Sequence, residues 1–184
     1  MENEEIELEL KMYFFVTYYL SDKQIGIQAG HVALEYADKY GGEEQFIKFN
    51  REWKTFIVLD GGTTNNGHDF KGVPLGTMNQ ILEDLQTNDI QYSIFQEPSL
   101  NDALTAICFI CDERVFNEKD YPEFVDYLFS ISLVYVESKW KSIKEFSYEE
   151  LVKKFPTEYK EWVRFLGGVK NVFLRELIKD KKLA

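Results

Sequence analysis

The stretch MYFFVTYYLSDKQIGIQAGHVALEYADKY, residues 12–40, decides the fold that this sequence predicts. Its first half is a run of aromatic, β-branched and aliphatic residues, which includes Phe14, Phe15, Val16, Tyr18, Tyr19 and Leu20. The run is too continuous for a half-exposed strand, so we expect a buried strand in the middle of a sheet. Ser21 and Asp22 supply a turn and a helix N-cap, and the helix that follows carries Gln28 and His31. A strand that runs into a helix places the helix N-terminus at the carboxyl edge of the sheet, where α/β proteins bind ligands.

Composition describes a soluble globular chain of ordinary domain size. The sequence has 184 residues, of which 45% are hydrophobic and 29% charged. It contains no apolar run of 18 residues, and its N-terminus is acidic, unlike that of a signal peptide, so we expect no membrane partner. Two cysteines make no disulfide framework, which indicates a reducing cytoplasm.

Charge is unevenly distributed. Residues 1–11 carry five Glu and one Lys, residues 12–138 carry eight basic and twenty acidic residues, and residues 139–184 carry twelve basic and seven acidic residues. An acidic body repels phosphate backbones, so any RNA contact is expected from the basic C-terminal third. The alternative is that the charges only keep the chain soluble.

The order of the predicted elements indicates an α/β sandwich with a mixed sheet. After the opening unit come a strand at 54–60, a helix at 75–87, and strands at 89–95 and 104–111. Helices are then expected at 121–133, at 147–155 and after each of Pro156 and the Gly167–Gly168 pair, while 133–136 fits either helix or edge strand. We therefore expect an acidic lead-in at 1–11, an α/β core at 12–114 and a helical extension at 115–184 packed on that core.

Two loops carry candidate ligand-binding residues. The first contains Gly61, Gly62, Thr63 and Thr64; its backbone amides could cradle a phosphate, although no GxxxxGK[ST] motif is present and a plain connector is the alternative. The second is the turn after the strand at 89–95, which holds a carboxylate, an amide and a hydroxyl at one strand edge. Its polar residues are Glu97, Asn101, Asp102 and Thr105. These can position water or bind a ribose, or they can cap the turn's own amides.

Histidine and cysteine offer little further chemistry. Cys108 and Cys111 have a C-x-x-C spacing but lie in a predicted strand, where residues three apart point to opposite faces, so we expect no metal site and no cofactor. His68 is expected to be solvated. His31, one turn after Gln28, is either a structural residue or a base.

The residues Gln28-Ala29-Gly30-His31-Val32-Ala33 after the opening strand resemble the strand–helix motif of class-2 peptidyl-tRNA hydrolases. The later elements come in the same order as in that family, over roughly residues 12–112: a second strand, an amphipathic helix, a turn with an acid, and a threonine-bearing strand. The segments EPSLNDALTAI (97–107) and DGGTT (60–64) look closer to a divergent branch of that fold from tailed-phage genomes.

The resemblance implies a mixed four-stranded sheet flanked by helices, and hydrolysis of the ester that joins a peptide to the 3′ end of tRNA. In that family a turn lysine, an acid and a threonine near the last strands are the working groups. Ester hydrolysis needs a base and a donor for the developing oxyanion, so we expect Glu97 as the base and Lys23 or the Gln28 amide as the donor. His31 and Thr105 complete the expected catalytic set, and Gln24 stands where the family has its turn lysine. The alternative is a non-catalytic module that binds a nucleotide, an RNA end or a host protein in the same cleft, in the host cytoplasm if the protein is viral. The sequence is also compatible with a homodimer.

Overall fold

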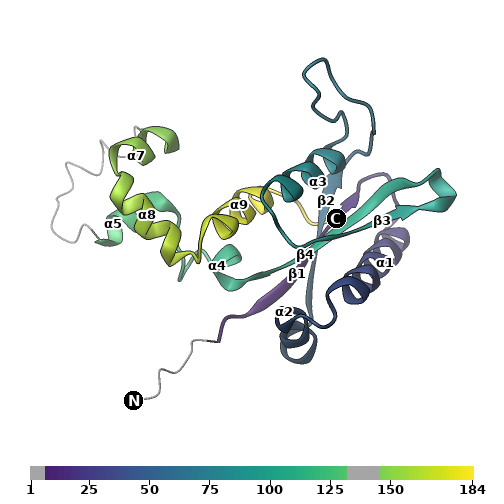
Figure 1. The fold of residues 1–184 in the computed structure, drawn as a ribbon, viewed down its shortest axis with the longest axis horizontal. Coiled ribbons are helices and arrows are strands. Elements are labelled where there is room, and N and C mark those ends of the chain that lie inside the picture. Colours follow the sequence, from purple (N-terminus) through teal and green to yellow (C-terminus); the bar gives the residue numbers. More distant parts are fainter. Residues whose placement is uncertain (1–6, 132–145) are drawn as a thin grey trace. The chain divides into compact units, whose positions relative to one another are not determined.

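The protein is built around a four-stranded mixed sheet, seen in a computed structural model that describes residues 7–131 and 146–184. The strands are β1 (Leu10–Thr17), β2 (Thr55–Gly62), β3 (Ser93–Glu97) and β4 (Ala103–Asp112), in the order β2-β1-β4-β3 (Figure 1). β1 pairs parallel with β2 and antiparallel with β4, and β3 pairs antiparallel with β4. The prediction of a mixed α/β sheet with the opening strand in its middle is confirmed.

Helices cover both faces of this sheet. Successive side chains of each strand point to opposite faces, so both faces carry apolar residues that need to be buried. Met12, Phe14 and Val16 point to one face and form a core with Val32 and Tyr36 of α1 (Asp22–Tyr40). The opposite face is covered by α3 (Thr77–Thr87), whose buried residues are Met78, Ile81 and Leu85. A Cβ added at Gly61 would meet both Met78 and Phe15, so this glycine allows α3 to pack closely against the sheet.

The connection from α1 to β2 is helical. α2 (Glu44–Lys48) continues into a π-helical turn at Phe49–Trp53, and Lys54 then adopts a left-handed conformation with φ of 52° before β2 begins.

Three of the boundaries that differ from the predicted ones lie at or near the site described below. β1 ends at Thr17, so Tyr18 and Tyr19 lie in the following turn and are exposed instead of buried in the strand. β2 continues through Gly62, which was expected in the loop. β3 starts four residues later than expected and ends with Glu97, which is a strand residue and not part of a turn.

The helical remainder forms its own compact unit. Residues 114–175 make up this second unit, and residues 1–113 together with 176–184 make up the first. The helices are α4 (Glu113–Phe116), α5 (Phe124–Ile131), α7 (Tyr148–Lys154), α8 (Pro156–Phe165) and α9 (Val169–Ile178). The second unit has its own core of Phe124, Leu128, Leu151, Trp162 and Leu166. The ambiguous segment 133–136 lies outside the described residues.

The C-terminal residues return to the sheet of the first unit. Leu183 forms an antiparallel bridge with Leu59, the Asp60 N–H donates to the Lys182 carbonyl at 2.9 Å, and the Ala184 N–H donates to the Val58 carbonyl at 3.0 Å. The tail therefore satisfies backbone groups of β2, the edge strand, which would otherwise invite pairing with another chain.

Candidate functional site

Three polar side chains from distant parts of the sequence meet at one edge of the sheet. We call this edge, where β1, β2 and β3 end at Thr17, Gly62 and Glu97 and where β4 begins, the site edge. The Thr105 hydroxyl donates to Gln28 Oε1 at 2.6 Å, and Gln28 Nε2 donates to Glu97 Oε2 at 2.7 Å. The Gln28–Glu97–Thr105 cluster is therefore one continuous hydrogen-bonded relay from a buried hydroxyl to a carboxylate.

A β-bulge places Thr105 in this relay. Phe95 pairs with Ala106 and Gln96 pairs with Leu104, so Thr105 is the extra, unpaired residue of β4. Regular alternation would turn Thr105 away from the face that Ala106 and Cys108 share with α1. The bulge breaks that alternation and lets the Thr105 hydroxyl reach Gln28 on α1, which is a common use of bulges beside functional sites.

Glu97 is held as an ionised acceptor. Its Oε1 accepts hydrogen bonds from the Ser99 N–H at 3.2 Å and the Ser99 hydroxyl at 2.7 Å, in addition to the Gln28 bond on Oε2. The Gln28 bond, followed by the Ser99 bonds and the attraction of His31, lowers the pKa of Glu97 below its ordinary value of 4.5. The half-buried carboxylate is thus charged throughout the neutral range.

His31 lies one helical turn after Gln28 on the exposed side of α1. Its ring stacks on Phe95 of β3, with centroids 4.5 Å apart and planes 10° from parallel. The histidine is exposed and not a core residue, and its contact with Phe95 places the ring over β3, the strand that carries Glu97.

Gln24, which stands at the expected lysine position, and its neighbour Lys23 both lie in the first turn of α1. Gln24 Oε1 accepts hydrogen bonds from the Ser21 N–H at 3.0 Å and the Ser21 hydroxyl at 2.9 Å, so Gln24 closes a capping box at the helix start. Gln24, Gln28 and His31 share one face of the helix, whereas Lys23 is about 100° around it. Lys23 is exposed to solvent.

The Gly61–Thr64 segment is tied into the fold. Gly61 is the extra residue of a second bulge, the Gly62 N–H donates to Asp60 Oδ1 at 2.7 Å, and the Thr63 N–H donates to Thr77 Oγ1 at 2.7 Å. Thr64 donates its hydroxyl to the Leu104 carbonyl, next to Thr105. A phosphate bound at the Gly62 and Thr63 amides would have to replace these internal bonds, so the contacts favour the connector alternative.

Asn101 and Asp102 shape the tight turn between β3 and β4. Both have a φ of 56°, a left-handed conformation that Asn and Asp tolerate better than most residues, and both side chains are exposed. The Asp102 N–H donates to the Glu97 carbonyl at 3.1 Å, while the Glu97 carboxylate itself caps the Ser99 amide. The turn therefore fixes the direction of Glu97.

Two residues of this site were missed by the sequence analysis. Ser99 supplies two of the three donors to Glu97, and Phe95 supplies the surface under His31. The Glu97-Pro98-Ser99 order was the available signal for Ser99, because an acid two residues before a serine can accept its amide and hydroxyl in a turn. The stacking partner of His31 had no local signal, since it depends on how β3 faces α1.

The cysteines lie in β4 as predicted, and both are buried. Burial raises the pKa of each thiol, and Cys108 Sγ lies 3.4 Å from the Val32 carbonyl. Residues 7–131 and 146–184 contain no group of three or more His, Cys, Asp or Glu side chains placed to hold a metal ion. Within the same ranges, no helix has the length and apolar character needed to cross a membrane.

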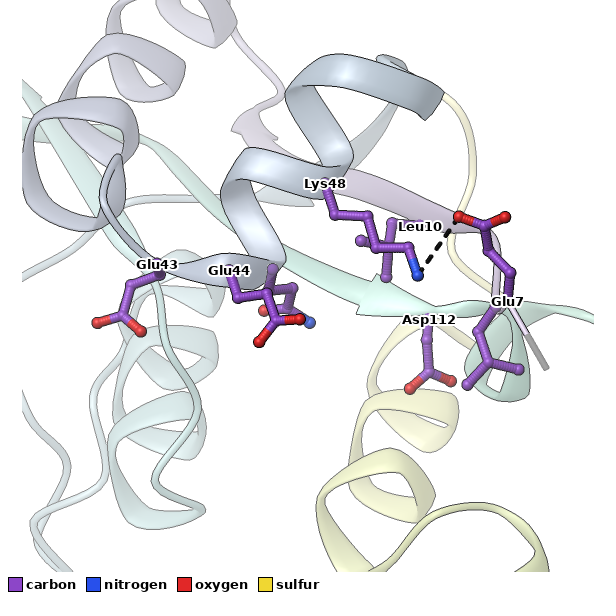
Figure 2. Close-up of a pocket in the computed structure, with 8 residues that line it drawn as sticks. Glu7, Leu10, Glu43, Glu44, Lys48 and Asp112 are labelled. Atoms are coloured by element: carbon purple, nitrogen blue, oxygen red, sulfur yellow. Dashed lines mark ion pairs between the residues drawn. The ribbon is translucent and has the colours of Figure 1, made fainter. Parts of the chain in front are cut away.

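A hollow lies at the other end of the sheet, near the start of β1 and the end of β4 (Figure 2). We call this end of the sheet the far edge. It has a volume of about 650 Å³ and is lined by Glu7, Leu8, Leu10, Glu43, Glu44, Gln45, Lys48 and Asp112. Lys48 Nζ and Glu7 Oε1 are 3.5 Å apart across it. A second hollow of about 330 Å³, lined by Asn66, His68 and residues of α3, has an exposed histidine at its rim, as expected for His68.

No protein-family model matches the chain, and neither does any curated protein. The chemistry of the Gln28–Glu97–Thr105 cluster, together with the resemblance in its motifs, is therefore the basis for a functional proposal.

Proposed function

We propose that the protein is a peptidyl-tRNA hydrolase-like esterase that releases a peptide from the 3′ end of tRNA, with the Gln28–Glu97–Thr105 cluster as its active site. One observation carries the proposal. The three polar groups expected at the site, the Gln28 amide, the Glu97 carboxylate and the Thr105 hydroxyl, are joined by hydrogen bonds of 2.7 Å and 2.6 Å, although Gln28 lies 69 and 77 residues from the other two.

In this proposal Glu97 is the general base. It accepts a proton from a water molecule as the water oxygen attacks the ester carbonyl. The bond between the carbonyl carbon and the ribose oxygen then breaks, and the proton passes to that oxygen, which leaves a free acid and a tRNA hydroxyl. Because the Glu97 carboxylate is ionised at neutral pH, the base is ready without prior deprotonation.

Gln28 and Lys23 supply the donors for the developing oxyanion. A carboxamide has two N–H groups, and Gln28 gives one of them to Glu97, which leaves the second for the substrate. Lys23 is exposed in the first turn of α1, and the proposal requires its long, flexible side chain to bring the ammonium to the cluster when substrate is bound. Thr105 is a positioning residue, because its bond to Gln28 Oε1 turns the amide nitrogen toward Glu97.

A second candidate is a cytoplasmic binding module that uses the same site without chemistry. Two observations favour it. The lowered pKa makes Glu97 a weaker base, and Gln24, which stands at the expected lysine position, already accepts a hydrogen bond from Ser21. An ionised carboxylate held by three donors is a good acceptor for the hydroxyls of a terminal ribose.

Peptide release from purified peptidyl-tRNA separates the two candidates. The hydrolase predicts turnover by the wild-type protein and its loss, by about 100-fold or more, in Glu97→Gln. Glu35→Gln, an exposed acid on α1 outside the cluster, is the matched control and should keep wild-type turnover. Absence of turnover in a cooperatively folded wild-type protein would overturn the hydrolase.

The binding module predicts stabilisation without consumption of the ligand. A nucleotide or tRNA present at 100 times its dissociation constant should stabilise the fold by about 2.7 kcal/mol, which a thermal melt detects readily. A wild-type protein that neither turns over peptidyl-tRNA nor is stabilised by tRNA or nucleotides would overturn both candidates.

A further inference from the structure

The turn between β1 and α1 presents two adjacent tyrosine rings to solvent at the site edge. Tyr18 is 60% exposed and Tyr19 is 48% exposed, and their rings meet edge to face with centroids 5.8 Å apart. We infer that this pair is a stacking platform for an unpaired base at the 3′ end of an RNA ligand. The inference rests on the proposed function and names the residues that hold the RNA strand beside the Gln28–Glu97–Thr105 cluster.

The backbone under the platform is fixed, although the rings are exposed. Thr17 is fully buried and donates its hydroxyl to the Gly62 carbonyl at 3.0 Å, and the Tyr18 N–H donates to the same carbonyl at 3.0 Å. A tyrosine buries a large apolar area when it packs into a core, so two neighbouring exposed rings give up stabilisation that other placements would provide. A fixed backbone that holds two rings in water is typical of a recognition surface.

The platform lies close to the proposed base. Only β4 separates β1 from β3 in the sheet, and neighbouring strands are about 4.8 Å apart, so the end of β1 lies about 10 Å from the end of β3, where Glu97 stands. A terminal ribose at Glu97 therefore has its own or the preceding base within reach of Tyr18 and Tyr19. The platform and the proposed active site thus lie at the same edge of the sheet.

The charge of the protein favours a single-stranded end over a duplex. Residues 12–138, which carry both the cluster and the platform, have eight basic against twenty acidic residues, so binding through many phosphates is disfavoured. Base–aromatic stacking needs no phosphate neutralisation and accepts every base, because each has a π-face. Stacking on Tyr18 and Tyr19 explains how an acidic domain could hold an RNA end.

The test measures binding directly, with a 5′-fluorescein-labelled single-stranded RNA tetranucleotide that has a free 3′ hydroxyl. Fluorescence anisotropy should show about tenfold or greater loss of affinity in Tyr18→Ala/Tyr19→Ala, because one stacked base is worth a factor of that order. Tyr18→Phe/Tyr19→Phe keeps the rings and should bind like the wild type. Phe70→Ala, which removes a 94% exposed ring from the loop after β2, is the matched control and should also bind like the wild type.

Salt and strand pairing give independent readouts. Stacking with at most two phosphate contacts predicts a slope of log affinity against log salt no steeper than about −1.4. A blunt duplex of the same sequence, whose terminal bases are paired, should bind at least tenfold more weakly. The inference is overturned by unchanged affinity in the alanine double variant, by an equal loss in Phe70→Ala, by equal duplex binding, or by no binding of the tetranucleotide at all.

Failure of the platform and failure of the hydrolase are distinguishable. If Glu97→Gln abolishes turnover while the alanine double variant binds RNA and turns over peptidyl-tRNA normally, the hydrolase stands and the platform falls. If the tetranucleotide binds through the tyrosines while the wild-type protein releases no peptide, the platform stands and the hydrolase falls.

Discussion

The two edges of the sheet hold their polar residues in different ways. At the site edge, Gln28, Glu97 and Thr105 come from three segments and are joined by bonds of 2.6 Å and 2.7 Å, around a hydroxyl that is fully buried. At the far edge, a hollow of about 650 Å³ is lined by charged residues that are exposed or half-buried, and Lys48 and Glu7 are 3.5 Å apart.

We therefore place the proposed site by the convergence of its hydrogen bonds and not by the size of a hollow. The far edge collects acidic groups around one lysine, which is an ordinary solvated surface with weak screened attractions. The site edge contains two β-bulges and a tight left-handed turn within a few residues of the cluster. The bulge at Thr105 directs its hydroxyl to Gln28, and the turn at Asn101 and Asp102 fixes the direction of Glu97. Substitutions at the two edges should therefore have unequal effects.

The largest expected effect on stability is that of Gln28→Leu. The substitution removes a buried amide that bonds both Thr105 and Glu97, and it leaves the Thr105 hydroxyl with only the longer 3.3 Å bond to the Phe95 carbonyl. We expect the free energy of unfolding to fall by about 1–3 kcal/mol in urea denaturation. Gln45→Leu, at the far edge, is the matched control and should change it by less than about 0.5 kcal/mol. Equal losses in the two variants would contradict the comparison.

Thr105→Val should have the next largest effect, about 1 kcal/mol, because it removes one buried hydrogen bond while keeping the shape of the side chain. In the double variant with Gln28→Leu, the two losses should not add, since both substitutions delete the same bond. A double-mutant cycle by urea denaturation measures this coupling. Full additivity would mean that Thr105 and Gln28 act independently, and the relay would then not exist in solution.

The sequence predicted the elements of the fold well but the cluster only in part. The buried strand from Met12 to Val16 and the Ser21 start of α1 follow from local patterns that the structure confirms. The contact between Thr105 and Gln28 could not be derived from such patterns, because regular strand alternation turns Thr105 to the other face and the bulge depends on pairing with β3. The meeting of these residues was anticipated only through the family resemblance.

At the turn that holds Tyr18 and Tyr19, the sequence pattern predicted a longer strand than the structure has. The apolar run continues through Leu20, so pattern alone extends the strand to include Tyr18 and Tyr19. The strand in fact ends at Thr17, where the Thr17 hydroxyl and the Tyr18 amide both bond the Gly62 carbonyl of β2. A tertiary contact with a residue 45 positions away therefore decides which aromatic residues are core and which are surface.

The pH dependence of stability tests the charge state of Glu97. A carboxyl whose pKa is lower in the folded protein stabilises the fold above its unfolded pKa, and this contribution is lost as the pH falls through the folded value. The wild type should thus be more stable than Glu97→Gln at pH 7, and the gap should close below about pH 4.5. Thermal melts between pH 3 and pH 7 measure it. In a Gln28→Leu background the gap should shrink, because the Gln28 bond is the largest cause of the shift; a gap that widened on acidification would contradict the assignment.

The smallest effect is expected from Lys48→Ala at the far edge. The Lys48 ammonium lies 3.5 Å from the Glu7 carboxylate, and the two side chains are 36% and 58% exposed. An ion pair exposed to this extent contributes little to stability, and salt screens its attraction further. The neighbouring Glu52 and Lys48 lower the pKa of Glu7, so removal of Lys48 shifts a titration at the surface and leaves the core untouched. Urea denaturation at low and high salt should give wild-type midpoints for Lys48→Ala in both. If this variant lost as much stability as Thr105→Val, the far edge would be as tightly organised as the site edge. Convergence of hydrogen bonds would then no longer single out the Gln28–Glu97–Thr105 cluster as the place where this protein acts.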